Sequence, residues 1–369
     1  MSDQRQLALL DEVAGAIEAL LLGGTTTASA ATQRTLSAAF EEASRARFLR
    51  LGSTLRIVIE ELKRLDSAPE RFSGSRLAFF LDRAWLLASA TRKALSDQDA
   101  SALQRITALP ANEPVAALAV ATLGVHKRVV PGAFAAFEFR LRLTRPLTLA
   151  GGATLARGTP LLWSMVFPLR ADLAVPPEAF LSLQQKQGFR PTDFLDRREI
   201  LITQVQLSSA PPYRMTLLPE TRVTQGEAVS DWTSLAHWDL PGWLAQLRAH
   251  RPDPLELAVE LSSEALLPDW RIDGEFAPSA VPGREASERE AEISALGCRF
   301  RLRIDAGESA LEQRLVAASG QCALMANVHV EYGRQVLMPL ALIDSAPEYP
   351  TLDPKKFDKA ALVRALNTR

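Results

Sequence analysis

The sequence predicts an α+β protein, in which an N-terminal helical bundle precedes one or two small antiparallel β-barrel or β-sheet modules and a short C-terminal helix. Three observations predict this class. Up to residue 110, apolar residues recur every three or four positions, the spacing of one helix face. Beyond residue 110 they alternate with polar residues, as a half-buried strand requires. The length of 369 residues suits several domains better than one core.

The helical pattern predicts a bundle of four helices within residues 1–110. The first helix is expected to end at Gly23 and Gly24. A Thr-, Ser- and Ala-rich stretch follows, and then a long helix over 48–65 with apolar residues in a three-four rhythm. Shorter apolar stripes over 77–88 and 103–109 predict the other two helices.

The first β-rich module is expected over residues 111–228. The segment FEFRLRL at 137–143 alternates strictly and predicts a strand with one buried face. The mostly apolar run 161–167 predicts a strand buried on both faces. ILITQVQL and YRMTLL, joined by Ser-Ser-Ala-Pro-Pro, predict a hairpin, and QQKQGFRPTDFLD before it reads as an exposed excursion.

A connecting helix over 229–252 and a second β-rich module over 253–369 complete the expected organisation. Alternation over 255–261 and 300–304 predicts strands, and the polar stretch 277–292 between them reads as a loose surface loop. NVHVEYGRQVLMPLALI predicts a hairpin, and Asp353 is expected to cap the C-terminal helix. FRLRL at 139–143 and FRLRI at 300–304 are a weak sign of duplication, so the two β regions can be duplicated modules or one sheet system.

Composition narrows the class of protein. With 47% hydrophobic and 23% charged residues, the chain is not disordered as a whole. A formal charge of -1 gives no global signature of a nucleic-acid binder. Cys298 and Cys322 are the only cysteines, which excludes a disulfide framework. Because the sequence shows neither a signal peptide nor an apolar run long enough for a bilayer, a cytoplasmic protein is expected, without a membrane partner.

No catalytic motif is recognisable. The glycine-bearing segment LAGGATLARGTP lacks the Gly-Lys-Ser/Thr end that holds nucleotide phosphates, and no Gly-x-Ser-x-Gly elbow is present. None of the four histidines is spaced to share a metal ion with another on one helix face. We therefore expect no metal, no cofactor and no catalytic residue, and a non-enzymatic role is favoured.

One group of candidate binding residues is basic. Lys127, Arg128, Arg140 and Arg142 fall on neighbouring predicted strands and can form a positive face for phosphates or acidic partners. The competing interpretation is that long basic side chains keep exposed strands soluble and protect sheet edges. The aromatic residues of these strands fall on the inward set, so base stacking is not favoured there.

A second candidate group lies in the connecting segment. Trp232, His237 and Asp239 place aromatic, basic and acidic groups within a short span. They can belong to an unrecognised enzyme site between the bundle and the β region, which requires His237 and Asp239 to converge in a concave pocket. The alternative is a tryptophan-rich seam between domains.

Four segments carry a resemblance to known proteins: RFSGSRLAFFLDRAWLLASATRKAL, TLGVHKRVVPGAFAAFEFRLR, SMVFPL and PPEAFL. Through them the chain resembles an uncharacterised bacterial family associated with gene clusters that encode MoxR-type AAA+ ATPases, von Willebrand A-domain proteins and SWIM zinc-finger proteins. The resemblance implies an accessory role beside an AAA+ ATPase system. It brings no catalytic motif.

Three functional hypotheses follow. The preferred one is a non-enzymatic protein-interaction or scaffold protein with protein partners. The first alternative is a nucleic-acid-binding protein that uses basic faces of barrel-like β modules. The second alternative is an enzyme with its site between the bundle and the β region.

Overall fold

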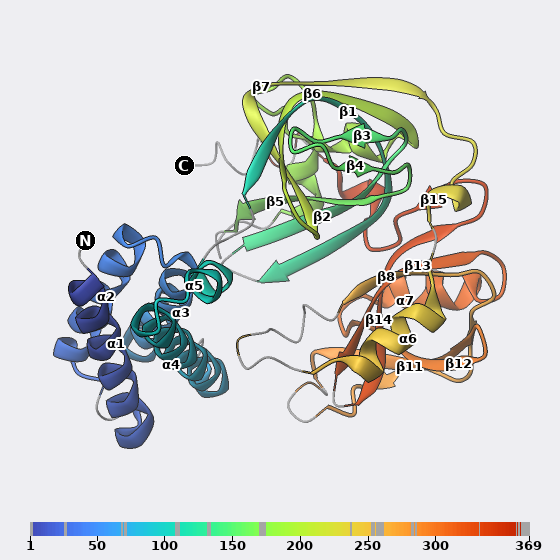
Figure 1. The fold of residues 1–369 in the computed structure, drawn as a ribbon. Coiled ribbons are helices and arrows are strands. Elements are labelled where there is room, and N and C mark those ends of the chain that lie inside the picture. The colour runs from blue at the N-terminus through green and yellow to red at the C-terminus, as the bar shows by residue number, and fades with distance from the viewer. Residues whose placement is uncertain are drawn as a thin grey trace. The chain divides into compact units, whose positions relative to one another are not determined.

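The computed structural model describes residues 3–25, 28–67, 69, 72–107, 111–130, 134–169, 175–236, 238–251, 255, 262–281, 284, 286–331, 333–358, 360 and 362. The chain forms two compact units. One comprises residues 1–111 with 251–256, and the other comprises 112–250 with 257–369. Helices make up the first unit and β-sheets dominate the second (Figure 1), which confirms the predicted fold class.

The first unit contains five helices among its described residues, one more than predicted. They are α1 (Asp3–Gly23), α2 (Ala30–Arg45), α3 (Leu49–Ser67), α4 (Gly74–Ser96) and α5 (Ala100–Thr107). The helix that was not predicted, α2, is the Thr-, Ser- and Ala-rich stretch. Its buried residues are Leu36, Ala39 and Ala43, and Ser29 caps it by accepting a hydrogen bond from the Thr32 amide. Alanine favours helix formation strongly but contributes little to a hydrophobic pattern.

A buried carboxylate ties two of these helices together. Glu61 of α3 is fully buried. It forms an ion pair with Arg64, receives a hydrogen bond from the Ser73 amide at 3.2 Å, and lies 2.9 Å from the Arg76 guanidinium of α4. Burial opposes its ionisation, but the hydrogen bonds from Arg76 and Ser73 and the two positive charges outweigh that effect and lower the pKa of Glu61. The carboxylate is therefore stabilised in its charged form.

Glu61→Gln is expected to destabilise the protein at neutral pH by about 1–3 kcal/mol, because it removes a charged partner from two arginines. A carboxyl whose pKa is lower in the folded state stabilises the fold above its ordinary value of 4.5. That contribution disappears as the pH falls through the lower, folded-state pKa. Urea denaturation at pH 7 and at successively lower pH should therefore show the gap between wild type and variant closing.

The matched control is Glu60→Gln, since Glu60 is 53% exposed and pairs only with Lys63 among the described contacts. It should change the stability little. A gap for Glu61→Gln that stays constant with pH would contradict the assigned role.

The first barrel occupies the N-terminal part of the second unit. Its strands are β1 (Asn112–Val130), β2 (Phe134–Leu143), β5 (Pro160–Pro168), β6 (Arg198–Ser208) and β7 (Tyr213–Ala228). They close in the order β1-β2-β5-β7-β6, with β5 and β7 parallel and the other pairs antiparallel. The hairpin between β6 and β7 is confirmed. The small pair β3 (Leu147–Thr148) and β4 (Thr154–Leu155) connects β2 to β5.

Two expectations about this barrel are wrong. The segment 184–196 is not an exposed excursion, because Phe189 and Phe194 are buried against Trp163 in the barrel core. They belong to the connection that carries the 3-10 turns η3 (Pro177–Ser182) and η4 (Pro191–Leu195). The strand over 161–167 is not buried on both faces either: beyond Trp163 it alternates, and Val166 is 63% exposed.

An eight-stranded sheet follows the connecting helix α6 (Leu240–Ala249), and we call it the second barrel because its strand order repeats that of the first. Its strands are β8 (Ser263–Leu267), β9 (Arg271–Ile272), β10 (Ala277–Pro278), β11 (Glu288–Ala295), β12 (Cys298–Asp305), β13 (Ala323–Glu331), β14 (Arg334–Ile343) and β15 (Pro347–Glu348). Helix α7 (Ser309–Ala318) lies between β12 and β13. The hairpin of β13 and β14 is confirmed by its antiparallel register, although Tyr332 at its turn lies outside the described residues.

The predicted surface loop over 277–292 is wrong in its second half. Residues from Glu288 onward form β11, in which Ala291, Ile293 and Ala295 face the core while the glutamates lie on the opposite face of the sheet. Alanines on the inward face conceal such a strand from a search for large apolar residues. The strand predicted over 255–261 lies outside the described residues, apart from Leu255.

The two sheets share one strand order. β8 pairs with β13 and β9 with β11, so together they act as one bent first strand, and β12 and β14 are parallel as β5 and β7 are. A five-stranded Greek-key barrel of this kind is the OB-fold arrangement. FRLRL lies on the second strand of its barrel and FRLRI on the third, so this short echo does not mark equivalent positions.

The barrels are joined through β1 and β14. A shared apolar cluster contains Leu123, Trp232, Met325 and Leu340. A Cβ atom placed on Gly124 would lie 2.7 Å from the Leu340 Cβ, which is closer than packed carbon atoms approach. The position of Gly124 therefore requires the absence of a side chain. The hydroxyl groups of Tyr349 and Thr351 also join the barrels, because they donate hydrogen bonds of 2.9 Å to carbonyl oxygens of β1.

The final described element is a short turn. Asp353 accepts a hydrogen bond from the Lys355 amide at 3.0 Å and caps the 3-10 turn η7 (Pro354–Lys356). Helical residues follow at Ala360 and Leu362, and the rest of the predicted C-terminal helix lies outside the described residues.

Among the helices of the described part of the chain, none is long and apolar enough to cross a membrane.

Gly124→Ala is expected to destabilise the two-barrel unit by about 1–3 kcal/mol, because the added methyl group must displace Leu340. Thermal denaturation of the full chain measures the loss. The matched control is Gly274→Ala, since nothing lies within 4 Å of a Cβ atom at Gly274. Equal stability of the two variants would contradict the close approach of β1 and β14.

Candidate functional site

The outer face of the first barrel gathers basic side chains from several strands. Phe137 and Phe139 point into the core, so Ala136, Glu138 and Arg140 point outward from β2. The register sets Arg128 of β1 beside Ala136, and Ala136 beside Val166 of β5. Four residues further along β2, the register sets Arg140 beside Leu162, and Leu162 beside Arg214 of β7. We call Arg128, Arg140, Arg214 and His126 the basic face.

Glu138 lies at the centre of the basic face. Its carboxylate is 2.6 Å from the Arg140 guanidinium and 3.9 Å from Nδ1 of His126. The nearby imidazole of His126 and the charges of Arg140 and Arg214 outweigh the opposing effect of burial and lower the pKa of Glu138. Its charge therefore neutralises only part of the face.

Lys127, which the sequence places with the basic candidates, is held inside the second unit. Its side chain is 12% exposed, and Nζ lies 3.1 Å from Glu178 in η3 and 2.7 Å from Glu308 before α7. Burial opposes its charge, but the two carboxylates outweigh burial and raise the pKa of Lys127. The ammonium group joins the two barrels and is not available to a ligand.

Arg140 and Arg142 both reach the second barrel. Arg142 is 4% exposed and forms an ion pair with Glu264 of β8, whose other oxygen lies 3.4 Å from Arg140. Removal of either partner would leave a buried charge unpaired, which destabilises proteins strongly. Arg142 therefore belongs to the contact between the two barrels, which we call the joint. Arg140 is shared between the joint and the basic face.

Arg128 and Arg214 remain exposed, and no carboxylate of the described residues lies within ion-pair distance of either. Arg214 was not among the residues predicted from the sequence, because it stands alone in YRMTLL.

A count of charged residues in each module would have indicated from the sequence that the first barrel is basic. Residues 112–228 contain 13 basic and 9 acidic residues, whereas residues 263–348 contain 8 basic and 14 acidic residues. The near-neutral chain is thus divided into a basic and an acidic barrel.

The second candidate group does not form a shared site among the described residues. Trp232 is 2% exposed within the apolar cluster between the barrels, which agrees with the seam interpretation. Asp239 caps α6 by accepting a hydrogen bond from the Gly242 amide at 3.0 Å. His237 lies outside the described residues, so its convergence with Asp239 stays a prediction.

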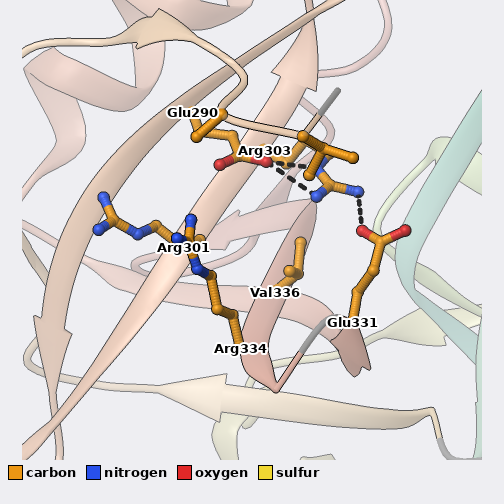
Figure 2. A pocket seen from close by; sticks show the side chains of 8 residues that line it. Glu290, Arg301, Arg303, Glu331, Arg334 and Val336 are labelled. Carbon is orange, nitrogen blue, oxygen red and sulfur yellow. Dashed lines mark hydrogen bonds and ion pairs between the residues drawn. The ribbon is translucent and has the colours of Figure 1, made fainter. Parts of the chain in front are cut away.

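The second barrel carries a pocket that sequence patterns did not predict. It has a volume of about 230 Å³ and is lined by Ala280, Val281, Glu290, Arg301, Arg303, Glu331, Arg334 and Val336. Figure 2 shows Arg303 between Glu290 and Glu331, with ion pairs to both. Glu288 is also 3.2 Å from Arg303. Burial opposes the charge of this guanidinium, but the carboxylates outweigh burial and raise the pKa of Arg303.

No family model and no curated protein match the chain. Among solved structures, a replication protein A heterotrimer bound to single-stranded DNA is 11% identical with a TM-score of 0.27, covering 70% of this chain and 54% of that chain. A murine DNA-binding protein bound to double-stranded DNA is 10% identical with a TM-score of 0.26, covering 61% and 90%.

A variant of the single-stranded DNA-binding protein from Thermus aquaticus is 8% identical with a TM-score of 0.17, covering 65% of this chain and 99% of that chain. Similarities at this level carry no argument about function. The barrel assignment here depends on the strand order and register of this chain itself.

Proposed function

We propose that the first barrel binds single-stranded nucleic acid along its basic face. The observation that supports this most strongly is the strand register, which sets Arg128, Arg140 and Arg214 on one outer surface. The outer sheet face of an OB-type barrel is a surface on which oligonucleotides can lie. Arginine suits this role because its planar guanidinium matches the geometry of a phosphate.

The charge balance of the face supports attraction of a polyanion. Arg128, Arg140 and Arg214 of the basic face are opposed by the carboxylate of Glu138, because Glu264, which also contacts Arg140, pairs with the buried Arg142. The row of Arg128 and that of Arg140 are four residues apart on β2, or about 13 Å at the rise of a strand. Cations at this separation can contact different phosphates of an extended strand.

Binding of this kind should be independent of sequence. Phe137 and Phe139 of β2 and Trp163 of β5 are directed into the core, where Phe139 packs against Trp163. Phe134, half-buried at the start of β2, is the one aromatic residue of this strand on the outward set. Base stacking therefore contributes little, and Val166 supplies the exposed apolar contact on this face. Phosphate contacts dominate, so the affinity must fall as salt rises.

The test compares wild type with Arg128→Ala/Arg214→Ala in a titration of a fluorescent single-stranded oligonucleotide at several salt concentrations. The double variant should bind more weakly at every sequence tested. Its slope of log affinity against log salt should be smaller by roughly 0.7 for each phosphate that the substituted arginines no longer neutralise. Arg299→Ala, which removes an 80% exposed arginine from the acidic barrel, should leave the slope unchanged. An unchanged slope in the double variant would exclude the basic face.

Our second proposal is a protein-interaction or scaffold role, beside the AAA+ ATPase system that the family resemblance implies. Two large apolar side chains of the helical unit support it. Leu22 of α1 is 90% exposed and Phe79 of α4 is 52% exposed. A partner that covers both side chains would remove their apolar surface from water.

Leu22→Ser/Phe79→Ser should abolish capture of a specific partner by the full chain in extracts of the native host, without lowering the melting temperature, because both side chains are already exposed. Quantitative mass spectrometry of the captured proteins measures this. Leu10, which is fully buried on α1, gives the contrast: Leu10→Ser should reduce the melting temperature. Recovery of this chain alone would contradict the scaffold role.

A further inference from the structure

The arginines that line the pocket of the second barrel differ in the number of carboxylates close to them. Arg303 is paired with Glu288, Glu290 and Glu331, and Arg284 shares Glu288 and Glu331, so two guanidinium groups face three carboxylates. Arg301 lies 3.0 Å from Glu292, but the same carboxylate is 3.3 Å from Arg299. Arg334 has no carboxylate within ion-pair distance among the described residues. The side of the pocket next to Arg301 therefore has an excess of positive charge.

The sheet directs these groups to one surface. Arg301 of β12 is the register partner of Val336 on β14. Arg334 precedes Val336 by two residues, so it projects from the same face of the sheet. Both guanidinium side chains line the pocket, and Figure 2 shows Arg334 extending toward Arg301, on the other side of Val336 from Glu331.

We propose that this pocket binds a small organic phosphate, with its phosphate group between Arg301 and Arg334. Arg299 and Arg301 share the single negative charge of Glu292, and Arg334 has no carboxylate within ion-pair distance among the described residues. Three guanidinium charges against one carboxylate leave two positive charges for the two negative charges of a phosphate monoester. Ala280, Val281 and Val336 form the apolar part of the lining. The volume of about 230 Å³ exceeds the 150 Å³ or so of a cavity that holds benzene, so a ring-sized group fits beside the phosphate.

The charge around the pocket selects against long polyanions. The second barrel has 14 acidic and 8 basic residues between 263 and 348, so a nucleic-acid strand is repelled by most of its surface. A compact phosphate avoids much of that repulsion, because the ionic atmosphere screens charges beyond about 8 Å at physiological salt. This ligand is therefore distinct from the strand proposed for the first barrel.

The test is isothermal titration calorimetry of phenyl phosphate into the full-length chain. Wild type should bind one equivalent, and Arg301→Gln and Arg334→Gln should each weaken binding at least tenfold. Arg271→Gln, which changes an exposed arginine of the same barrel outside the pocket lining, should bind as wild type does. Circular dichroism and the melting temperature establish that each variant is folded.

Two comparisons define the ligand class. Benzoate, with one negative charge, and inorganic phosphate, without an apolar group, should both bind more weakly than phenyl phosphate. Absence of saturable binding by wild type, equal binding by the arginine variants, or equal binding of inorganic phosphate would overturn the proposal. The Arg301→Gln and Arg334→Gln variants should keep wild-type oligonucleotide binding, so failure here is separable from failure of the basic face.

Discussion

The close approach of β1 to β14 is the constraint on which the two-barrel unit depends. At Gly124 the backbone of the first barrel lies against Leu340 of the second, and no side chain can be accommodated between them. Hydrogen bonds from Tyr349 and Thr351 hold the same strand from the second barrel. This contact brings Glu264 beside Arg142, and Glu308 beside Lys127. The joint thereby determines which basic side chains are paired with carboxylates inside the protein.

The remaining charges are distributed differently over the two barrels. In the basic barrel, Arg128 and Arg214 are left exposed after the joint has paired Lys127 and Arg142. In the acidic barrel, Arg303 is surrounded by carboxylates while Arg301 and Arg334 border a small pocket. We propose an extended polyanion for the first arrangement and a compact anion for the second, because a local excess of charge, rather than the net charge of the chain, governs the attraction of an anion.

Two of the elements that sequence reasoning missed, α2 and β11, have small residues on their inward faces. Ala39 and Ala43 in α2, and Ala291 and Ala295 in β11, are buried but hardly alter a hydrophobic pattern. The prediction for 184–196 was wrong for another reason: polar residues surround Phe189 and Phe194, whose burial depends on the space left inside the barrel. Of the candidate site, Arg140 was found from alternation and Arg128 from the basic run that contains it. Arg214 was not found, because it stands alone in YRMTLL and its basic neighbour lies across β5.

The sequence by itself determined the change from helices to strands near residue 110, the hairpins of β6 with β7 and β13 with β14, and the basic outward residues of β2. These features are local, since side-chain period and turn residues act within a few positions. Only the tertiary structure decided the closure of the first barrel, the pairing of Lys127 and Arg142 with carboxylates of the other barrel, and the convergence of Arg301 with Arg334. Such pairs form across strands whose registers and contacts are set by packing of the whole unit, so no local spacing encodes them.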